Sequence, residues 1–210
     1  MLDGAGAESD QSGAVSRDDI LGATRPHRVR CTSLMRQYVP PVPSADLVTA
    51  FVERATAVHA EVRHLSSARE ISAAVADLLR CKNLPAEIHI APDAQTIDTG
   101  ALTVKRTPPG PDDAALTIAP FGIAETGTLA YPAATDNPAS WHFRPGFEIA
   151  VLKASDIVPH MENIIARVKA NGLPHTLNFV TGPSRTGDIE QTLELGAHGP
   201  KALAILIVRE

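Results

Sequence analysis

The chain of 210 residues carries 19 basic and 24 acidic side chains, a net charge of −5, and this balance excludes a general electrostatic affinity for nucleic acid. Hydrophobic residues make up 44% and charged residues 20%, which is typical of a globular protein. The cysteines Cys31 and Cys81 are too few for a cysteine-ligated zinc or iron–sulfur site, and we expect free thiols in a reducing cytoplasm.

Residues 1–30 are rich in Gly, Ala, Ser, Asp and Arg and show no periodicity, which predicts a disordered or loosely attached arm. The arm begins with acids and has no apolar core, unlike a signal peptide. No run approaches the roughly 18 apolar residues of a membrane span. We expect a helical segment over 31–84 and an α/β domain over 85–210, with 31–210 forming one globular unit.

Two amphipathic helices are predicted after the proline-rich stretch at 38–44. Ser44 is a candidate N-cap, and apolar residues spaced three or four apart from Leu47 to Leu65 indicate one long helix. A second helix is expected to begin at Ser66 or Ser67. Its predicted inward-facing residues are Ile71, Ala74, Val75, Leu78 and Leu79.

From residue 85 on, short runs of β-forming residues are separated by Pro, Gly and Asp. Strands are predicted at 86–92, 100–106, 114–120, 127–133, 147–153, 175–181 and 202–208. Helices are predicted over about 156–170, with Ser155 or Asp156 as cap and Asn171-Gly172 as stop, and over 186–195, stopped by Gly196. Because the second half alternates strands and helices, we expect an α/β fold with a mostly parallel sheet covered by helices and a hairpin in the middle of the chain.

The run "TGPSRTGDIEQ" at 181–191 joins a predicted strand to a predicted helix. Unpaired N–H groups at a helix N-terminus attract phosphate or carboxylate. We expect an anion site here, in which the glycine turns the chain, two hydroxyls face the ligand and an arginine fork pairs with a carboxylate. The alternative is purely structural: a hydroxyl caps the helix, and the arginine pairs with the acid three residues on. The candidate substrate-binding residues are Gly182, Ser184, Arg185, Thr186 and Asp188.

A second candidate group precedes the predicted strand at 127–133. Glu125 could serve as base or nucleophile if partly desolvated, and Thr126, Gly127 and Thr128 follow it directly. A plain turn before the strand would need the same residue types. His198, in the loop before the last strand, is either a ligand contact or a histidine that binds backbone carbonyls.

The sequence lacks the motifs of several enzyme classes. The run Gly182 to Gly187 is one residue too long for the GxSxG of a serine hydrolase. Neither GxGxxG nor GxxxxGK[ST] occurs, and the histidines show no HExxH spacing. We therefore expect no metal and no cofactor in this chain.

Three strings, "GIAETGTLAYPA", "GFEIAVLKASDIV" and "NFVTGPSRTGDIEQTLELGAHGPKALAILIV", in this order resemble the lactate utilization (LUD) domain family over roughly residues 85–208. The resemblance implies a Rossmann-like fold similar to the phosphosugar isomerase and CoA-transferase superfamily. One departure lies at 140–152, "SWHFRPGFEIAVL", where Gly146-Phe147-Glu148 replaces a Pro-x-His of the family pattern.

The resemblance also implies a role in oxidising L-lactate to pyruvate, as a non-cluster component beside iron–sulfur partner proteins or as a subunit of an L-lactate dehydrogenase complex. Under this hypothesis Arg185 holds a small anionic metabolite such as lactate or pyruvate, and Glu125 and His198 orient it or move a proton. Two alternatives stay open. One is a stand-alone CoA-transferase-like enzyme that uses Glu125 as nucleophile; the other is a regulatory or assembly subunit that binds a metabolite without chemistry.

Overall fold

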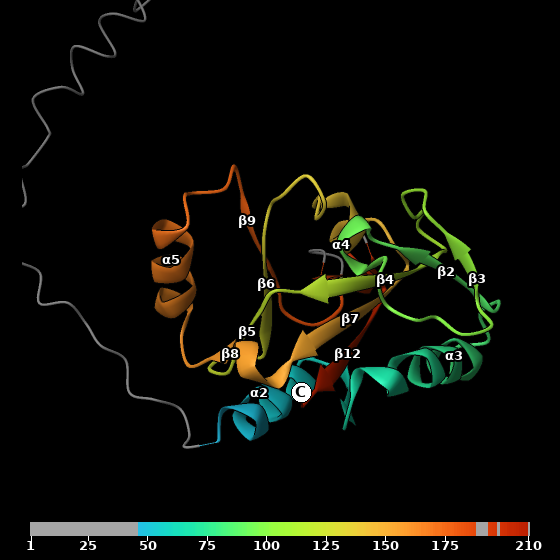
Figure 1. Ribbon diagram of the computed structural model, residues 1–210, viewed down its shortest axis with the longest axis horizontal. Helices are drawn as coiled ribbons and strands as arrows, with labels where there is room; N and C mark the ends of the chain where they lie inside the picture. Colours follow the sequence, from blue (N-terminus) through green and yellow to red (C-terminus); the bar gives the residue numbers. More distant parts are fainter. Residues whose placement is uncertain (1–45, 188–192, 197, 210) are drawn as a thin grey trace, which may run out of the picture. The chain divides into compact units, whose positions relative to one another are not determined.

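In the computed structural model, which describes residues 46–187, 193–196 and 198–209, parallel strands form a six-stranded central sheet (Figure 1). Their order across the sheet is β1-β12-β7-β4-β2-β3. Their bounds are β1 Glu61–Leu65, β2 Glu87–Ile90, β3 Thr103–Lys105, β4 Ala114–Ala119, β7 Phe147–Lys153 and β12 Ala202–Val208. The apolar strand expected at 202–208 lies inside this sheet, between β1 and β7, and the expected α/β fold is confirmed.

A second, four-stranded sheet has the order β8-β5-β6-β9. Its strands are β5 Phe121–Ile123, β6 Thr128–Pro132, β8 Ile157–Val158 and β9 Leu177–Val180. β5 and β6 form the antiparallel hairpin expected in the middle of the chain. β9 pairs antiparallel with β6, with Val180 opposite Leu129, and this pairing places the chain that follows β9 beside the start of β6.

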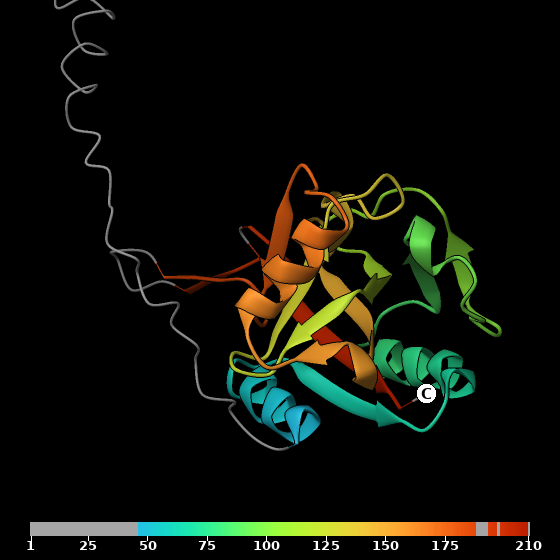
Figure 2. The same ribbon diagram turned by 60° about the vertical axis from the view of Figure 1, so that its left-hand side comes forward.

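The central sheet is covered on both faces. Successive side chains of a strand point to opposite faces of the sheet, so neighbouring residues of β7 pack in different hydrophobic clusters. Ile149 and Val151 pack in the cluster that contains the apolar face of α3, Ile71–Cys81. Ala150 and Leu152 pack with the second sheet and with α2, Leu47–Ala57. The outer face of the second sheet is covered by α5, Met161–Ala170. Figures 1 and 2 show α3 and α5 on opposite sides of the strands.

The other helical elements within the described residues are short. α4 covers Ser140–Phe143, and three 3₁₀ turns cover Ala68–Glu70, Pro92–Ala94 and Ala154–Asp156. The helix predicted over 156–170 begins later than expected, at Met161 with His160 as its N-cap residue, because β8 occupies the preceding positions. Its predicted stop is confirmed at Asn171 and Gly172, where φ is +96°.

The single long helix predicted over 47–65 is wrong beyond residue 57. Asp46 rather than Ser44 caps α2, and its carboxylate accepts hydrogen bonds from the N–H groups of Val48 and Thr49 at 3.1 and 3.3 Å. The chain then leaves the helix at His59, where φ is +68°. Residues 61–65 pair with β12 instead. Backbone pairing along the free edge of β12 is favoured over the helix that the local spacing of apolar residues indicates.

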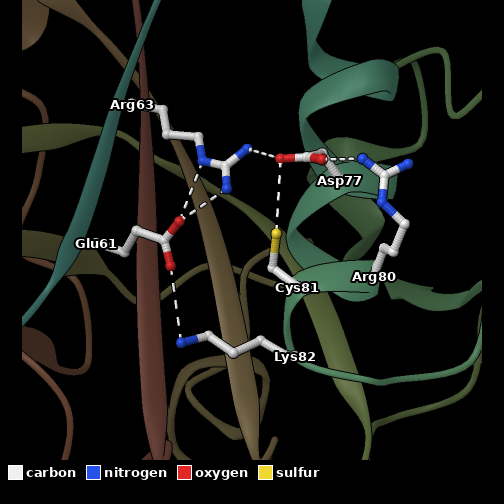
Figure 3. Close-up of polar contacts among 6 residues, drawn as sticks. All are labelled: Glu61, Arg63, Asp77, Arg80, Cys81 and Lys82. Carbon is white, nitrogen blue, oxygen red and sulfur yellow. Dashed lines mark hydrogen bonds and ion pairs between the residues drawn. The ribbon is translucent and has the colours of Figure 1, made fainter.

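An ion-pair network attaches this edge strand to α3 (Figure 3). The guanidinium of Arg63 on β1 contacts Glu61 Oε1 at 2.8 Å and Asp77 Oδ2 of α3 at 2.6 Å. Asp77 also pairs with Arg80, and Lys82 Nζ lies 3.7 Å from Glu61. The hydrogen bond from Arg63 lowers the pKa of the Asp77 carboxyl, so the network is strongest when that group is charged.

The helix predicted over 186–195 is also wrong. β10 Arg185–Gly187 and β11 Leu193–Leu195 form an antiparallel pair, with Arg185 opposite Leu195. Backbone bonds secure both ends: the N–H of Ser184 donates to Pro200 O at 2.8 Å, and the N–H of Gly196 donates to Ser184 O at 3.1 Å. Non-local backbone pairing therefore replaces the local helix pattern. The arm at 1–30 lies outside the described residues, and the boundary between 84 and 85 stays a prediction.

Candidate functional site

The segment that follows β9 turns sharply at Gly182. Its φ is +70°, and a Cβ at this position would lie 2.3 Å from the backbone oxygen of Val58. Only glycine fits such a close approach to the end of α2. The expectation of a helix N-terminus as the anion-binding element fails here, since β10 follows. Any anion binding at this place must rest on side chains and loop backbone.

Ser184 ties this segment to the loop before β12. Besides its two backbone bonds, its Oγ accepts a hydrogen bond from the N–H of His198 at 3.4 Å. A Cβ on Gly199 would lie 3.2 Å from the Ser184 Cβ, so the two segments are closely packed. The serine hydroxyl therefore positions the loop that carries His198 rather than capping a helix.

A pocket of ≈ 510 Å³ opens where these segments meet the end of α2. Its described lining contains the basic side chains His59, Arg185 and His198, and no Asp or Glu. Arg185 is exposed and forms no ion pair with any described residue. The charge of Arg185, with no carboxylate in the described lining, gives a positive potential that favours an anion. Thr181 and Ser184 add hydroxyls to the lining, and Phe143 and Phe179 add aromatic rings.

A chain of hydroxyl groups connects the second candidate group to this pocket. Thr126 Oγ1 lies 2.7 Å from Thr128 Oγ1, and Thr128 Oγ1 lies 2.7 Å from Thr181 Oγ1. Thr128 is buried at the start of β6, and Thr181 lines the pocket. The β6–β9 pairing thus joins two strings that are far apart in the sequence.

Gly127 has a packing explanation. Its φ is +66°, and a Cβ would lie 2.2 Å from the backbone nitrogen of Ala55 in α2. Its N–H closes the turn by donating to Ile123 O at 2.9 Å. The turn between β5 and β6 therefore touches the helix backbone directly, and this contact alone requires a glycine.

Glu125 does not line the pocket. Its carboxylate is 46% exposed, and Oε2 lies 3.1 Å from Nδ1 of His160. His160 is 6% exposed, and its Nε2 is buried without a hydrogen-bond partner among the described residues. The sequence reading missed His160, which precedes α5 and is brought to Glu125 by the pairing of β5 with β8.

A fully buried polar cluster was also missed. Oε1 of Glu148 accepts hydrogen bonds from Thr117 at 2.9 Å and Tyr131 at 3.1 Å, and lies 2.8 Å from Nδ1 of His142. Neither Glu148 nor His142 is exposed, and the His142 ring stacks on Tyr131 with centroids 3.6 Å apart. Burial, and next the Glu148 carboxylate, raise the pKa of Tyr131 well above its ordinary value.

The buried cluster extends to the loop after β2. Nε2 of His142 contacts Oδ1 of Asn137, whose Nδ2 donates to Asp93 Oδ2 at 2.9 Å. Burial raises the pKa of Asp93 to about 6. One signal in the sequence pointed to this cluster: Glu148 is the one polar residue in the apolar run at 147–152, where a buried charge requires partners. The departure from the family pattern at 146–148 is the same place.

The structure therefore brings four candidate residues, Gly182, Ser184, Arg185 and His198, into the lining of one pocket, and links Thr126 and Thr128 to it by hydroxyl contacts. It places Glu125 beside His160 instead. For Thr186 only the backbone in β10 is described, and Asp188 lies outside the described residues. The ligand role of each candidate stays a prediction.

The described part of the chain contains no group of three or more His, Cys, Asp or Glu side chains placed to hold a metal ion. Within the same residues, every helix is too short or too polar to cross a bilayer.

Residues 112–208 match the LUD domain family. Lactate utilization protein C of Geobacillus thermodenitrificans is 34% identical over 93 residues, which cover 42% of this chain and 39% of that protein. Lactate utilization protein C of Bacillus subtilis is 36% identical over 100 residues, 45% of this chain and 42% of that protein. The matched part thus spans less than half the length of these relatives.

A crystal structure of a DUF162 family protein from Deinococcus radiodurans shares the fold. Its TM-score is 0.57 with 24% sequence identity, and the likeness covers 80% of this chain and 99% of that chain. The matched family segment begins just before β4 and runs to the end of β12, so it contains β4 and β7 of the central sheet, the second sheet and the pocket segments at 181–185 and 198–200. The similarity to the LUD domain family is therefore carried by residues 112–208.

Proposed function

We propose that this protein is a component of a lactate-utilization system and binds a small anionic metabolite in the pocket beside Arg185. One observation carries the proposal: the described lining of that pocket has three basic side chains and no acidic one. The names of the relatives, lactate utilization protein C, support the metabolic setting.

Binding would follow from the chemistry of the lining. The planar fork of Arg185 matches a carboxylate through two parallel hydrogen bonds. The hydroxyls of Thr181 and Ser184 offer neutral donors for a 2-hydroxy or 2-oxo group, and the His198 ring offers a further polar contact. With Cys31 and Cys81 as its only cysteines, this chain would leave electron transfer to iron–sulfur partner proteins.

Calorimetric titration with L-lactate and with pyruvate tests the binding step. We expect Arg185→Ala to weaken binding at least tenfold, because hydrogen bonds to a charged group contribute about 1.5–3 kcal/mol. Arg106→Ala is the matched control: Arg106 is exposed, lies outside the pocket and forms no ion pair with any described residue. Equal affinities of the wild type and Arg185→Ala would show that the arginine is not the anion contact.

Deletion of the gene in its native host tests the metabolic role. We expect loss of growth on L-lactate, restored by the wild type and by Arg106→Ala but not by a folded Arg185→Ala protein. Normal growth of the deletion strain on L-lactate would reject the lactate role. Undiminished turnover with Glu125, Arg185 and His198 all replaced would instead favour an assembly subunit without chemistry.

The environment of Glu125 supports a second candidate, a CoA-transferase-like enzyme. Its carboxylate is half exposed and is oriented by His160 at 3.1 Å. Attack of this carboxylate on an acyl-CoA would give a mixed anhydride and release CoA, whose thiolate would then form a glutamyl thioester and release the acyl carboxylate. Mass analysis after incubation with acetyl-CoA and hydroxylamine tests this. An unmodified Glu125 would exclude the covalent route.

A further inference from the structure

The pocket beside Arg185 combines its basic side chains with two aromatic ones. Phe143 of α4 is 37% exposed and Phe179 of β9 is partly buried, and both line the pocket. A phenylalanine ring in contact with water is unfavourable unless a ligand covers it. The other large apolar residues with comparable exposure in the described chain, Met161, Ile165 and Leu173, lie elsewhere.

The pocket is larger than a three-carbon acid requires. Its volume of ≈ 510 Å³ falls within the roughly 300–1,000 Å³ of pockets that enclose organic molecules of drug size. A carboxylate held by Arg185 would leave most of this space, including the two rings, in contact with water. The unfilled part is therefore available to an apolar substituent.

The buried polar cluster around Glu148 holds Phe143 in place. His142, which precedes Phe143 in the chain, contacts Glu148 and Asn137, and both His142 and Trp141 are buried. The one-turn helix α4 is thus anchored from its inner side, while Phe143 points to the pocket. A contact that is positioned before the ligand arrives loses less entropy on binding than a mobile one.

We propose that the ligand of this pocket is an anion that carries an aromatic ring, held by Arg185 at its charged end and by Phe143 and Phe179 at its ring. The inference rests on the proposed function only in taking this pocket as the anion site. An arginine fork fits a carboxylate and a phosphate equally well. The proposed ligand class is therefore defined by an aromatic ring joined to an anionic group, and it includes aryl-substituted 2-hydroxy acids and nucleoside monophosphates.

Titration of the full chain with L-lactate, 3-phenyllactate, 2-phenylethanol and AMP tests this class. Trp141, the chain's one tryptophan, lies in α4 and gives a fluorescence readout beside the calorimetric one. We expect 3-phenyllactate to bind about 10- to 100-fold more tightly than L-lactate, from burial of the ring. We expect 2-phenylethanol, which lacks the charge, to bind weakly. AMP binding more tightly than 3-phenyllactate would assign the anionic end to phosphate within the same class.

Two variants separate the ring contact from the charge contact. Phe143→Ala should weaken 3-phenyllactate or AMP about tenfold and change L-lactate less than twofold, whereas Arg185→Ala should weaken all three. Leu173→Ala, 74% exposed and outside the pocket, is the control for removal of a surface apolar group. Equal affinity for L-lactate and 3-phenyllactate, or an unchanged preference in Phe143→Ala, would overturn the inference and leave the lactate proposal standing. Failure of every anion to bind in an Arg185-dependent manner would overturn both.

Discussion

Nδ1 of His142 lies 2.8 Å from Oε1 of Glu148, and neither side chain is exposed. Thr117 and Tyr131 donate to the same oxygen, so three polar partners meet at one buried atom. When a buried carboxylate loses its partner, the free-energy cost of removing it from water is no longer offset by the attraction between the two groups. The pair therefore couples α4 to the central sheet through β7.

His142→Ala should lower the free energy of unfolding by up to about 3–5 kcal/mol, because the buried Glu148 side chain loses one of its three polar partners and keeps only Thr117 and Tyr131. Glu148→Gln, which keeps the shape and an accepting oxygen, should cost less. The double replacement His142→Leu with Glu148→Leu should cost less than the sum of the single Leu changes. Urea denaturation of the wild type, the two single Leu variants and the double Leu variant measures this coupling, and strict additivity would show that the two groups do not act as a pair.

Asp93 makes stability depend on pH. Its folded-state pKa of about 6 exceeds the ordinary 3.8, so between these values the folded chain binds more protons than the unfolded chain. The contribution of this group to stability is fully present below about pH 4 and is lost as the pH rises through 6. Asp93→Asn should therefore be the more stable protein at pH 7, by at most about 3 kcal/mol.

Wild type and Asp93→Asn must be compared at two pH values, because other carboxyl groups change the stability of both proteins with pH in the opposite direction. The pKa of Asp77 is lowered by Arg63, and its contribution is lost as the pH falls. The difference between wild type and Asp93→Asn cancels that shared term. Denaturation curves at pH 4 and pH 7 should show a small difference at the first and a larger one at the second; the same difference at both would mean that Asp93 has an ordinary pKa.

Gly127 and Gly172 offer a matched pair of substitutions. Both have positive φ, +66° and +96°, but a Cβ on Gly127 would collide with the backbone of α2, whereas one on Gly172 would meet nothing within 4 Å. Gly172→Ala should cost about 1 kcal/mol from backbone strain. Gly127→Ala should cost about 2–5 kcal/mol from strain and overpacking together. Similar thermal shifts for both variants would argue against the contact with α2.

Thr128→Val tests the hydroxyl chain between the two strings. It keeps the shape of a buried side chain that is 3% exposed but leaves Thr126 and Thr181 without their shared partner. We expect a loss of about 1 kcal/mol in stability, and a changed anion affinity only if Thr181 contacts the ligand. Calorimetry on the folded variant separates these effects. Thr176→Val, on an exposed threonine ahead of β9, is the control for loss of a hydroxyl.

Much of the fold could be predicted because its signals are local. The apolar spacing from Ile71 to Leu79 predicted α3, and all five of its predicted inward residues are buried. The apolar run at 202–208 predicted a strand buried on both faces, and β12 is that strand. In these elements the period of the side chains and the surface they bury agree, so no distant residue was needed to choose between helix and strand.

Part of the candidate site could be predicted in the same way. Glycine, hydroxyl and arginine in the run at 181–187 marked a turn with ligand-binding groups, and Gly182, Ser184 and Arg185 do line one pocket with His198. The helix expected after them was wrong, because the backbone of 185–187 pairs with 193–195. Backbone hydrogen bonds from Ser184 N–H to Pro200 O and from Gly196 N–H to Ser184 O hold the ends of this strand pair.

Composition and motif spacing alone predicted the α/β class, the strands β6, β7, β9 and β12 of the second half and the turn at Gly182 before β10. Only the tertiary structure decided that residues 61–65 form an edge strand, that Glu125 meets His160, and that Asp93, Asn137, His142 and Glu148 join in one buried cluster. Local periodicity reports which face of an element is apolar. It carries no information on which buried polar groups satisfy one another, because those partners come from strands and loops that meet only when the sheets close.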